Sequence, residues 1–151
     1  MAQGANVFDL AVAMLETDTM IADYIFGDVD DKGIQKIGDA ANFGIFKQGW
    51  QMIRSSVPQY TKLAAADYKA GAALNSNLHW DIAVLHASQA HYGLAVWFKG
   101  HRGGQRGFDG TWPPDDIANY KSAVLWIRDQ IAADRKALTD DRKWWVEVPP
   151  V

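Results

Sequence analysis

Glutamate is rare in this chain. Of the 18 acidic residues, sixteen are aspartates, and the two glutamates are Glu16 and Glu147. Glu16 directly follows Leu15, at the end of an apolar stretch with helical spacing. An apolar setting and the negative C-terminal end of a helix both disfavour a charged carboxylate, so we expect a raised pKa at Glu16. Such a carboxyl can serve as a general acid near neutral pH, whereas the plainer interpretation is a solvated residue at a helix end.

An aspartate-rich segment follows Glu16, with aspartates at Asp23, Asp28, Asp30, Asp31 and Asp39. Glycoside hydrolysis uses one protonated and one ionised carboxyl across the sugar, and a loop aspartate about a dozen residues after a helix-end glutamate would supply the second. Calcium binding is another interpretation, but Lys32 falls where a loop of alternating oxygen ligands needs an oxygen. The third interpretation is a solvated loop of Asx turns.

Three of the histidines, His79, His86 and His91, are separated by seven and five residues. Zinc-binding helices place two histidines four residues apart on one face, so this spacing does not predict a zinc site. The chain has no cysteine, no GxSxG motif and no P-loop lysine, which argues against thiolate sites, a hydrolase serine and phosphate binding. We therefore expect neither a metal nor a cofactor.

Length and charge narrow the class of protein. A chain of 151 residues can bury one sizeable core, so we expect a single catalytic domain over residues 1–151, present as a monomer. The formal net charge of -3 argues against a nucleic-acid partner. The longest apolar run, Leu10–Leu15, is too short to span a membrane, and the first residues carry no basic start of a signal peptide.

Helical periodicity dominates the elements that must position these residues. Apolar spacings of three and four residues predict helices over about Val7–Glu16, Asp39–Arg54, Thr61–Leu74, Leu78–Phe98 and Pro114–Leu138. Asn6 is the expected N-cap of the first helix, and residues 100–110 are predicted to be a glycine-rich loop. No segment shows sustained period-two alternation. The predicted fold is mainly α, with a small β-ribbon or irregular loop in the aspartate-rich segment after the first helix.

Several strings resemble glycoside hydrolase family 134, the endo-β-1,4-mannanases. They are GDAANFGIFKQGW at residues 38–50, HASQAHYG at 86–93, WFKGHR at 97–102 and NYKSAVLWIR at 119–128. Together the similar segments span roughly residues 10–131 of the chain. The resemblance implies a lysozyme-like α+β fold and a secreted, extracellular protein whose signal peptide is not part of this sequence. It also implies hydrolysis of β-1,4-mannan or manno-oligosaccharides with inversion.

The same resemblance implies a glutamate as general acid and an aspartate as general base. The base follows the acid by about a dozen residues in a Tyr-x-x-Gly-Asp setting, a spacing compatible with two carboxyls facing each other across the sugar. Tyr24-Ile-Phe-Gly-Asp28 matches this setting, and Asp28 lies twelve residues after Glu16. The segment after Asp28 is longer than expected for the family. This departure leaves Asp30 as a rival base and the role of Lys32 open.

Polar residues beside glycine or aromatic positions in these strings are candidates for contacting the sugar: Lys32, Asn42, Gln89, His91 and Arg102. The alternative is that Gln89 and His91 satisfy buried backbone groups, while Arg102 pairs with an aspartate on the surface.

Two other functions remain open from the residues alone. One is a lysozyme-like hydrolase of chitosan, chitin or peptidoglycan, and the other is a module that binds carbohydrate or protein without hydrolysis.

Overall fold

The computed structural model describes residues 4–17, 19–22, 29–30, 32–139, 144 and 146. The first helix, α1 (Val7–Glu16), begins and ends as predicted. The Asn6 side chain caps it by accepting hydrogen bonds from the backbone N–H groups of Phe8 and Asp9. In turn, the Asp9 carboxylate accepts a hydrogen bond from the backbone N–H of Asn6 at 2.8 Å. Such a reciprocal capping box satisfies backbone donors that a helix start leaves unpaired. The cap therefore fixes where α1 starts, and with it the position of Glu16 one helix length away.

The predicted helix over residues 39–54 is wrong in its first part. A short 3-10 turn, η1 (Gly38–Ala40), leads into β1 (Asn42–Phe43), which pairs antiparallel with β2 (Gln48–Gly49) before the short helix α2 (Trp50–Ser56). Gly44 has φ +74° and Lys47 has φ +45°, both in the left-handed region that a continuous helix excludes. The β-ribbon predicted after the first helix thus exists, but it follows the aspartate-rich segment. Within the described part of that segment, Val29 and Gln35 form an isolated bridge.

The middle of the chain also departs from the prediction. After the 3-10 segment η2 (Ala65–Leu74), the predicted helix over 78–98 is divided at Gly93 into α3 (Leu78–Tyr92) and α4 (Leu94–Phe108). Gly93 has φ +69°, which ends α3 and starts α4 in a new direction. The predicted glycine-rich loop over 100–110 is wrong, because α4 continues to Phe108 with one kink at Gly104, where φ is +53°. A Cβ at Gly100 would collide with the ring of Phe108, so this glycine allows the two parts of α4 to pack closely across the kink.

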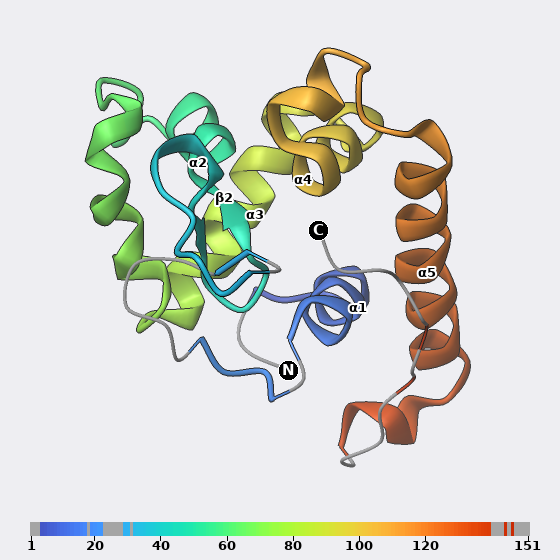
Figure 1. Cartoon of the computed structure of the whole chain (residues 1–151). Helices are drawn as coiled ribbons and strands as arrows, with labels where there is room; N and C mark the ends of the chain where they lie inside the picture. The colour runs from blue at the N-terminus through green and yellow to red at the C-terminus, as the bar shows by residue number, and fades with distance from the viewer. Residues whose placement is uncertain are drawn as a thin grey trace.

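The last helices complete the fold. Pro114 occupies the first turn of α5 (Pro114–Ala133), as predicted, and the short η3 (Arg135–Leu138) follows it. Figure 1 shows α1 lying beside α5, and these two helices pack more extensively than any other pair of described elements. The fold class is confirmed as mainly α with a small two-stranded antiparallel sheet, in keeping with a lysozyme-like α+β domain. No helix in the described part of the chain is both long and apolar enough to cross a membrane.

Two apolar clusters form the core. One lies between α1, α4 and α5 and includes Val12, Trp97 and Ile127, and the other lies under β1, α2 and the start of α3 and includes Trp50 and Val84. The β1–β2 hairpin joins them, because Phe46 in its turn belongs to the first cluster and Phe43 in β1 to the second. Buried side chains from both clusters therefore hold the hairpin, and the first cluster holds α1.

Candidate active site

Three elements converge on the carboxyl of Glu16, the last residue of α1. Tyr120 from α5 donates its hydroxyl to Glu16 Oε1, and Nε2 of His101 from α4 lies 3.2 Å from the same oxygen. The Glu16 side chain is 17% exposed, so one part of it still reaches solvent. No described residue makes a hydrogen bond to Oε2. Within the described part of the chain, the carboxyl is therefore held through Oε1.

His101 is positioned by aromatic packing. Its ring stacks on that of Trp97, with centroids 4.4 Å apart and planes inclined by 14°, and lies 5.7 Å from the ring of Tyr120. Trp97 belongs to the core, and the His101 side chain is only 2% exposed. Because residues four apart share one helix face, α4 aligns Trp97 and His101 directly. The imidazole therefore has little freedom to turn away from Glu16.

The pKa of Glu16 differs from the prediction. Burial has the largest effect and raises this pKa, but the hydrogen bond and charge of His101, the hydrogen bond from Tyr120 and the charge of Lys47 together bring it below the usual glutamate value. The expected raised pKa is therefore wrong for the protein without substrate. Sequence patterns suggested the apolar setting but gave no sign of the donors and cations that oppose it. The pKa of Tyr120 is raised well above its usual value by burial and by Glu16, so its hydroxyl stays protonated as a donor.

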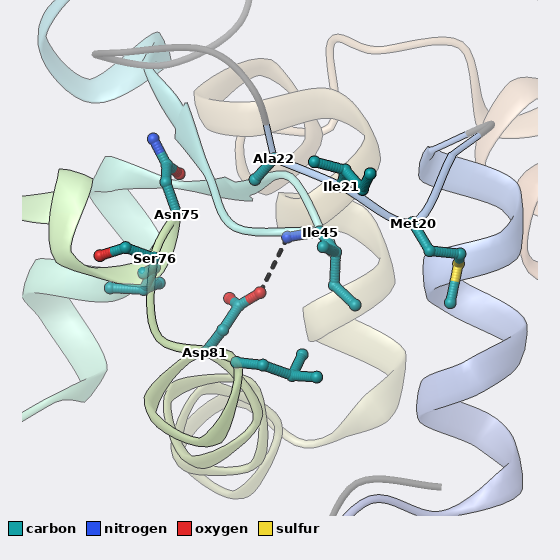
Figure 2. A pocket seen from close by; sticks show the side chains of 9 residues that line it. Met20, Ile21, Ala22, Ile45, Asn75, Ser76 and Asp81 are labelled. Atoms are coloured by element: carbon teal, nitrogen blue, oxygen red, sulfur yellow. Dashed lines mark hydrogen bonds between the residues drawn. The ribbon is translucent and has the colours of Figure 1, made fainter.

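The turn that carries Lys47 is held by a buried carboxylate. Asp81, in the first turn of α3, accepts hydrogen bonds from the backbone of Ile45 at 2.8 Å and from Gln48 Nε2 at 2.6 Å. Figure 2 shows the Asp81 carboxyl pointing at the backbone nitrogen of Ile45. Asp81 is fully buried, and desolvation raises its pKa to about 7 against the opposing hydrogen bonds. This contact links α3 to the residue whose charge acts on Glu16.

A cavity of about 210 Å³ lies beside the same turn (Figure 2). Its lining is mainly apolar, with a few polar groups, and includes Met20, Ile21, Ala22, Ile45, Asn75, Ser76 and Asp81. One wall, residues 20–22, continues the chain that leaves α1 just after Glu16, and another wall belongs to the turn that carries Lys47. The cavity therefore lies next in sequence to Glu16 on one wall and to Lys47 on another.

The predicted general base, Asp28, lies outside the described residues, so its distance from Glu16 stays a prediction. The rival, Asp30, uses Oδ1 to accept hydrogen bonds from the backbone of Lys32 at 2.9 Å and of Ile34 at 2.8 Å. This is the Asx-turn role that the plainer interpretation gave to the aspartate-rich segment. Lys32 is exposed in that turn, and its side chain remains only a candidate for contacting sugar.

The other predicted sugar contacts have the following surroundings in the described structure. Arg102 is 8% exposed and makes a bidentate ion pair with Asp116, with both bonds at 2.8 Å. Gln89 has its Nε2 buried without a hydrogen-bond partner in the described structure. His91 is exposed on α3 with its ring against Tyr92, and Asn42 is half-buried in β1. Their contact with substrate stays a prediction, and Arg102 has the ion pair that the alternative expected.

Sequence reasoning missed the two side chains that contact the Glu16 carboxyl. His101 falls in the predicted loop over 100–110, and Tyr120 falls in the predicted last helix, where it was not singled out. The four-residue spacing of Trp97 and His101 is a helical signal that the surrounding glycines concealed. Among the described residues, no cluster of three or more histidine and acidic side chains is arranged to hold a metal ion.

A largely buried glutamate that is anchored at one oxygen, at the end of a helix beside a small β-hairpin, is suited to donating a proton to a glycosidic oxygen. The family model for glycosyl hydrolase family 134 matches residues 1–148. The chain belongs to glycoside hydrolase family 134. Comparison with curated proteins finds no match. Membership of family 134 makes the protein a glycoside hydrolase with a carbohydrate substrate, and it confirms the resemblance noted in the sequence.

Proposed function

We propose that this family 134 protein is an endo-β-1,4-mannanase that hydrolyses its substrate with inversion of configuration. In this proposal Glu16 protonates the glycosidic oxygen, and Asp28 removes a proton from the attacking water. The observation that carries the proposal is the geometry of Glu16, a largely buried carboxyl at a helix end that Tyr120 and His101 hold at Oε1. The twelve-residue spacing and the Tyr24-to-Asp28 string support the choice of base.

A low pKa for Glu16 in the free protein is compatible with this role. Burial already acts to raise the pKa of Glu16, and a bound sugar would cover the exposed part of the carboxyl and strengthen that effect. In the transition state Glu16 becomes a carboxylate, and the Tyr120 hydroxyl and His101 Nε2 are positioned to stabilise that charge. Interactions that strengthen as charge develops accelerate the reaction.

We also propose that the cavity beside Ile45 binds a sugar next to the scissile bond, because its walls continue into the segments that carry Glu16 and Lys47.

The test is a polysaccharide panel assayed with the wild type and matched variants. Release of reducing ends is measured on linear β-1,4-mannan, chitosan, chitin and peptidoglycan. We expect hydrolysis of mannan only, and Glu16→Gln should lose roughly 10²- to 10⁴-fold in turnover, the usual contribution of a general acid. Glu147→Gln, at the one other glutamate of the chain, is the control and should retain turnover. Hydrolysis of one of the other polymers instead would reassign the substrate.

The base and the stereochemistry need separate measurements. Asp28→Asn should abolish turnover, and Asp30→Asn should retain it, because an asparagine can still accept the backbone hydrogen bonds of the turn. Proton NMR of the first product should detect the α-anomer, as inversion at a β-linkage requires. A β-anomer as first product would mean retention and would exclude this assignment of the two residues. In an inverting enzyme the two carboxyls should also stand roughly 6.5–9.5 Å apart, which leaves room for the attacking water.

A further inference from the structure

The His101 side chain is almost completely buried, yet within the described structure its hydrogen-bonding contact is with Glu16. Nε2 lies 3.2 Å from Glu16 Oε1, and the ring is packed against Trp97 and Tyr120. A carboxylate can only accept hydrogen bonds, so Nε2 carries the hydrogen whenever Glu16 is ionised. Burying an imidazole requires compensation, because a polar group without a partner is costly in the interior. The Glu16 carboxylate therefore supplies the hydrogen-bond partner that the buried His101 ring needs.

We propose that His101 is a positioning residue that holds the Glu16 carboxyl through Oε1 and stabilises the carboxylate that forms when Glu16 gives up its proton. This inference rests on the proposed role of Glu16 as the general acid. His101 itself does not touch the substrate in this proposal. It acts through Glu16, in the same way that an orienting group acts through the acid or base that it holds.

The groups around Glu16 make the direction of the effect clear. From α4 it faces His101, from α5 the hydroxyl of Tyr120, and from the β1–β2 turn the charge of Lys47. Burial favours the neutral acid, and these three groups favour the carboxylate. His101 opposes burial both by its hydrogen bond and by its charge, and its hydrogen bond is the largest of the opposing effects. Removing His101 should therefore raise the pKa of Glu16, so that the neutral acid persists to higher pH.

The experiment is the pH profile of kcat/KM on β-1,4-mannan. This profile reports the pKa values of the essential acid and base in the free enzyme. His101→Gln keeps a hydrogen-bond donor without a charge, and His101→Phe keeps a ring to stack on Trp97 without a donor. Both variants should move the alkaline limb of the profile to higher pH, and His101→Phe should move it further. His79→Gln is the matched control, because His79 is exposed at the start of α3, and its profile should coincide with the wild type.

The outcomes separate this inference from the proposed function. If Glu16→Gln is inactive but neither His101 variant moves the alkaline limb, the role of His101 is wrong and the general acid stands. A loss of kcat at all pH values with an unmoved limb would mean that His101 only supports the fold. If Glu16→Gln retains turnover, the proposed acid itself is wrong.

A measurement on the unsubstituted protein keeps the test open if the variants do not fold. Carbon NMR of the Glu16 carboxyl against pH should place its pKa below the usual glutamate value. Nitrogen NMR of the His101 ring should find the hydrogen on Nε2 while Glu16 is ionised, because a carboxylate can only accept. A Glu16 pKa at or above the usual value, or a His101 ring whose Nε2 carries no hydrogen, would overturn the proposal.

Discussion

Tyr120 donates its hydroxyl to Oε1 of Glu16 across 104 residues of sequence. The phenol belongs to the core between α1 and α5, so the packing of these helices places the donor at the carboxyl. A hydroxyl whose pKa is raised well above its usual value by burial remains a donor throughout the range in which the enzyme would work. The catalytic proposal therefore depends on how the two helices pack as well as on Glu16.

The first prediction follows from that contact. Tyr120→Phe removes the hydroxyl and keeps the ring, so the carboxylate that forms in the transition state loses one of its two donors at Oε1. A hydrogen bond to a charged group contributes about 1.5–3 kcal/mol, which corresponds to roughly a 10- to 100-fold loss in kcat. Turnover on mannan measures the loss, and Tyr68→Phe, at a half-buried tyrosine packed against the other apolar cluster, is the control. An unchanged kcat in Tyr120→Phe would mean that this donor does not stabilise the transition state.

The helices at the two ends of the fold could be predicted from the sequence because their signals are local. Asn6 and Asp9 form the capping box of α1 within four residues, and Pro114 starts α5 in the position that suits its missing N–H. Glu16 could be singled out for the same reason, since a helix end and its apolar neighbours are visible in a short window. Local sequence was sufficient wherever the determining contact was also local.

The rest of the fold and site depends on contacts between distant residues. The β1–β2 turn forms where a helix was predicted because Asp81 accepts the backbone N–H of Ile45 from 36 residues away. The partner of Glu16 on α4, His101, is 85 residues from it. Neither relationship has a periodicity that a short window could detect. The glycines of α4 were interpreted as loop residues because their close packing against side chains such as Phe108 is also invisible in the sequence.

The second prediction concerns the pH dependence of stability at Asp81. Its pKa is about 7 in the folded protein against 3.8 for an ordinary aspartate, so the folded state binds more protons than the unfolded state between these values. Stability from this group is therefore present at low pH and is lost as the pH rises toward about 7, by at most about 4 kcal/mol. Asp81→Asn cannot titrate, so its unfolding free energy should fall less between about pH 5 and about pH 8 than that of the wild type.

Urea denaturation at the two pH values measures this difference. Asp115→Asn, at an exposed aspartate in the first turn of α5, is the control and should keep the pH dependence of the wild type. Asp81→Asn should also be less stable than the wild type at low pH, because it keeps the acceptor for only part of the hydrogen bonds to the turn. Equal pH dependence in Asp81→Asn and the wild type would show that Asp81 does not titrate in this interval.

The third prediction compares two glycines with nearly the same positive φ. Gly44 has φ +74° and Gly110 has φ +73°, but a Cβ at Gly44 would collide with the Asp81 carboxyl, whereas a Cβ at Gly110 meets nothing within 4 Å. Gly110→Ala should therefore cost only the backbone strain, roughly 1–2 kcal/mol. Gly44→Ala should cost that strain and in addition disrupt the hydrogen bonds that hold the turn. Thermal unfolding ranks the two variants, and equal losses of stability would contradict the packing described for Gly44.

The fourth prediction tests whether the cavity beside Ile45 binds sugar. Ala22 lines this cavity and is half-buried, so Ala22→Phe places a large ring in or across a space of about 210 Å³. A group that binds substrate equally in the ground state and the transition state affects KM and spares kcat. We therefore expect KM for long manno-oligosaccharides to rise and kcat to stay near its wild-type value. Initial rates against substrate concentration separate the two constants.

Ala118→Phe, on the exposed surface of α5 away from the cavity lining, is the control. If Ala22→Phe leaves KM unchanged for every oligosaccharide length, the substrate does not occupy this cavity, and the sugar beside the scissile bond must be bound by other residues.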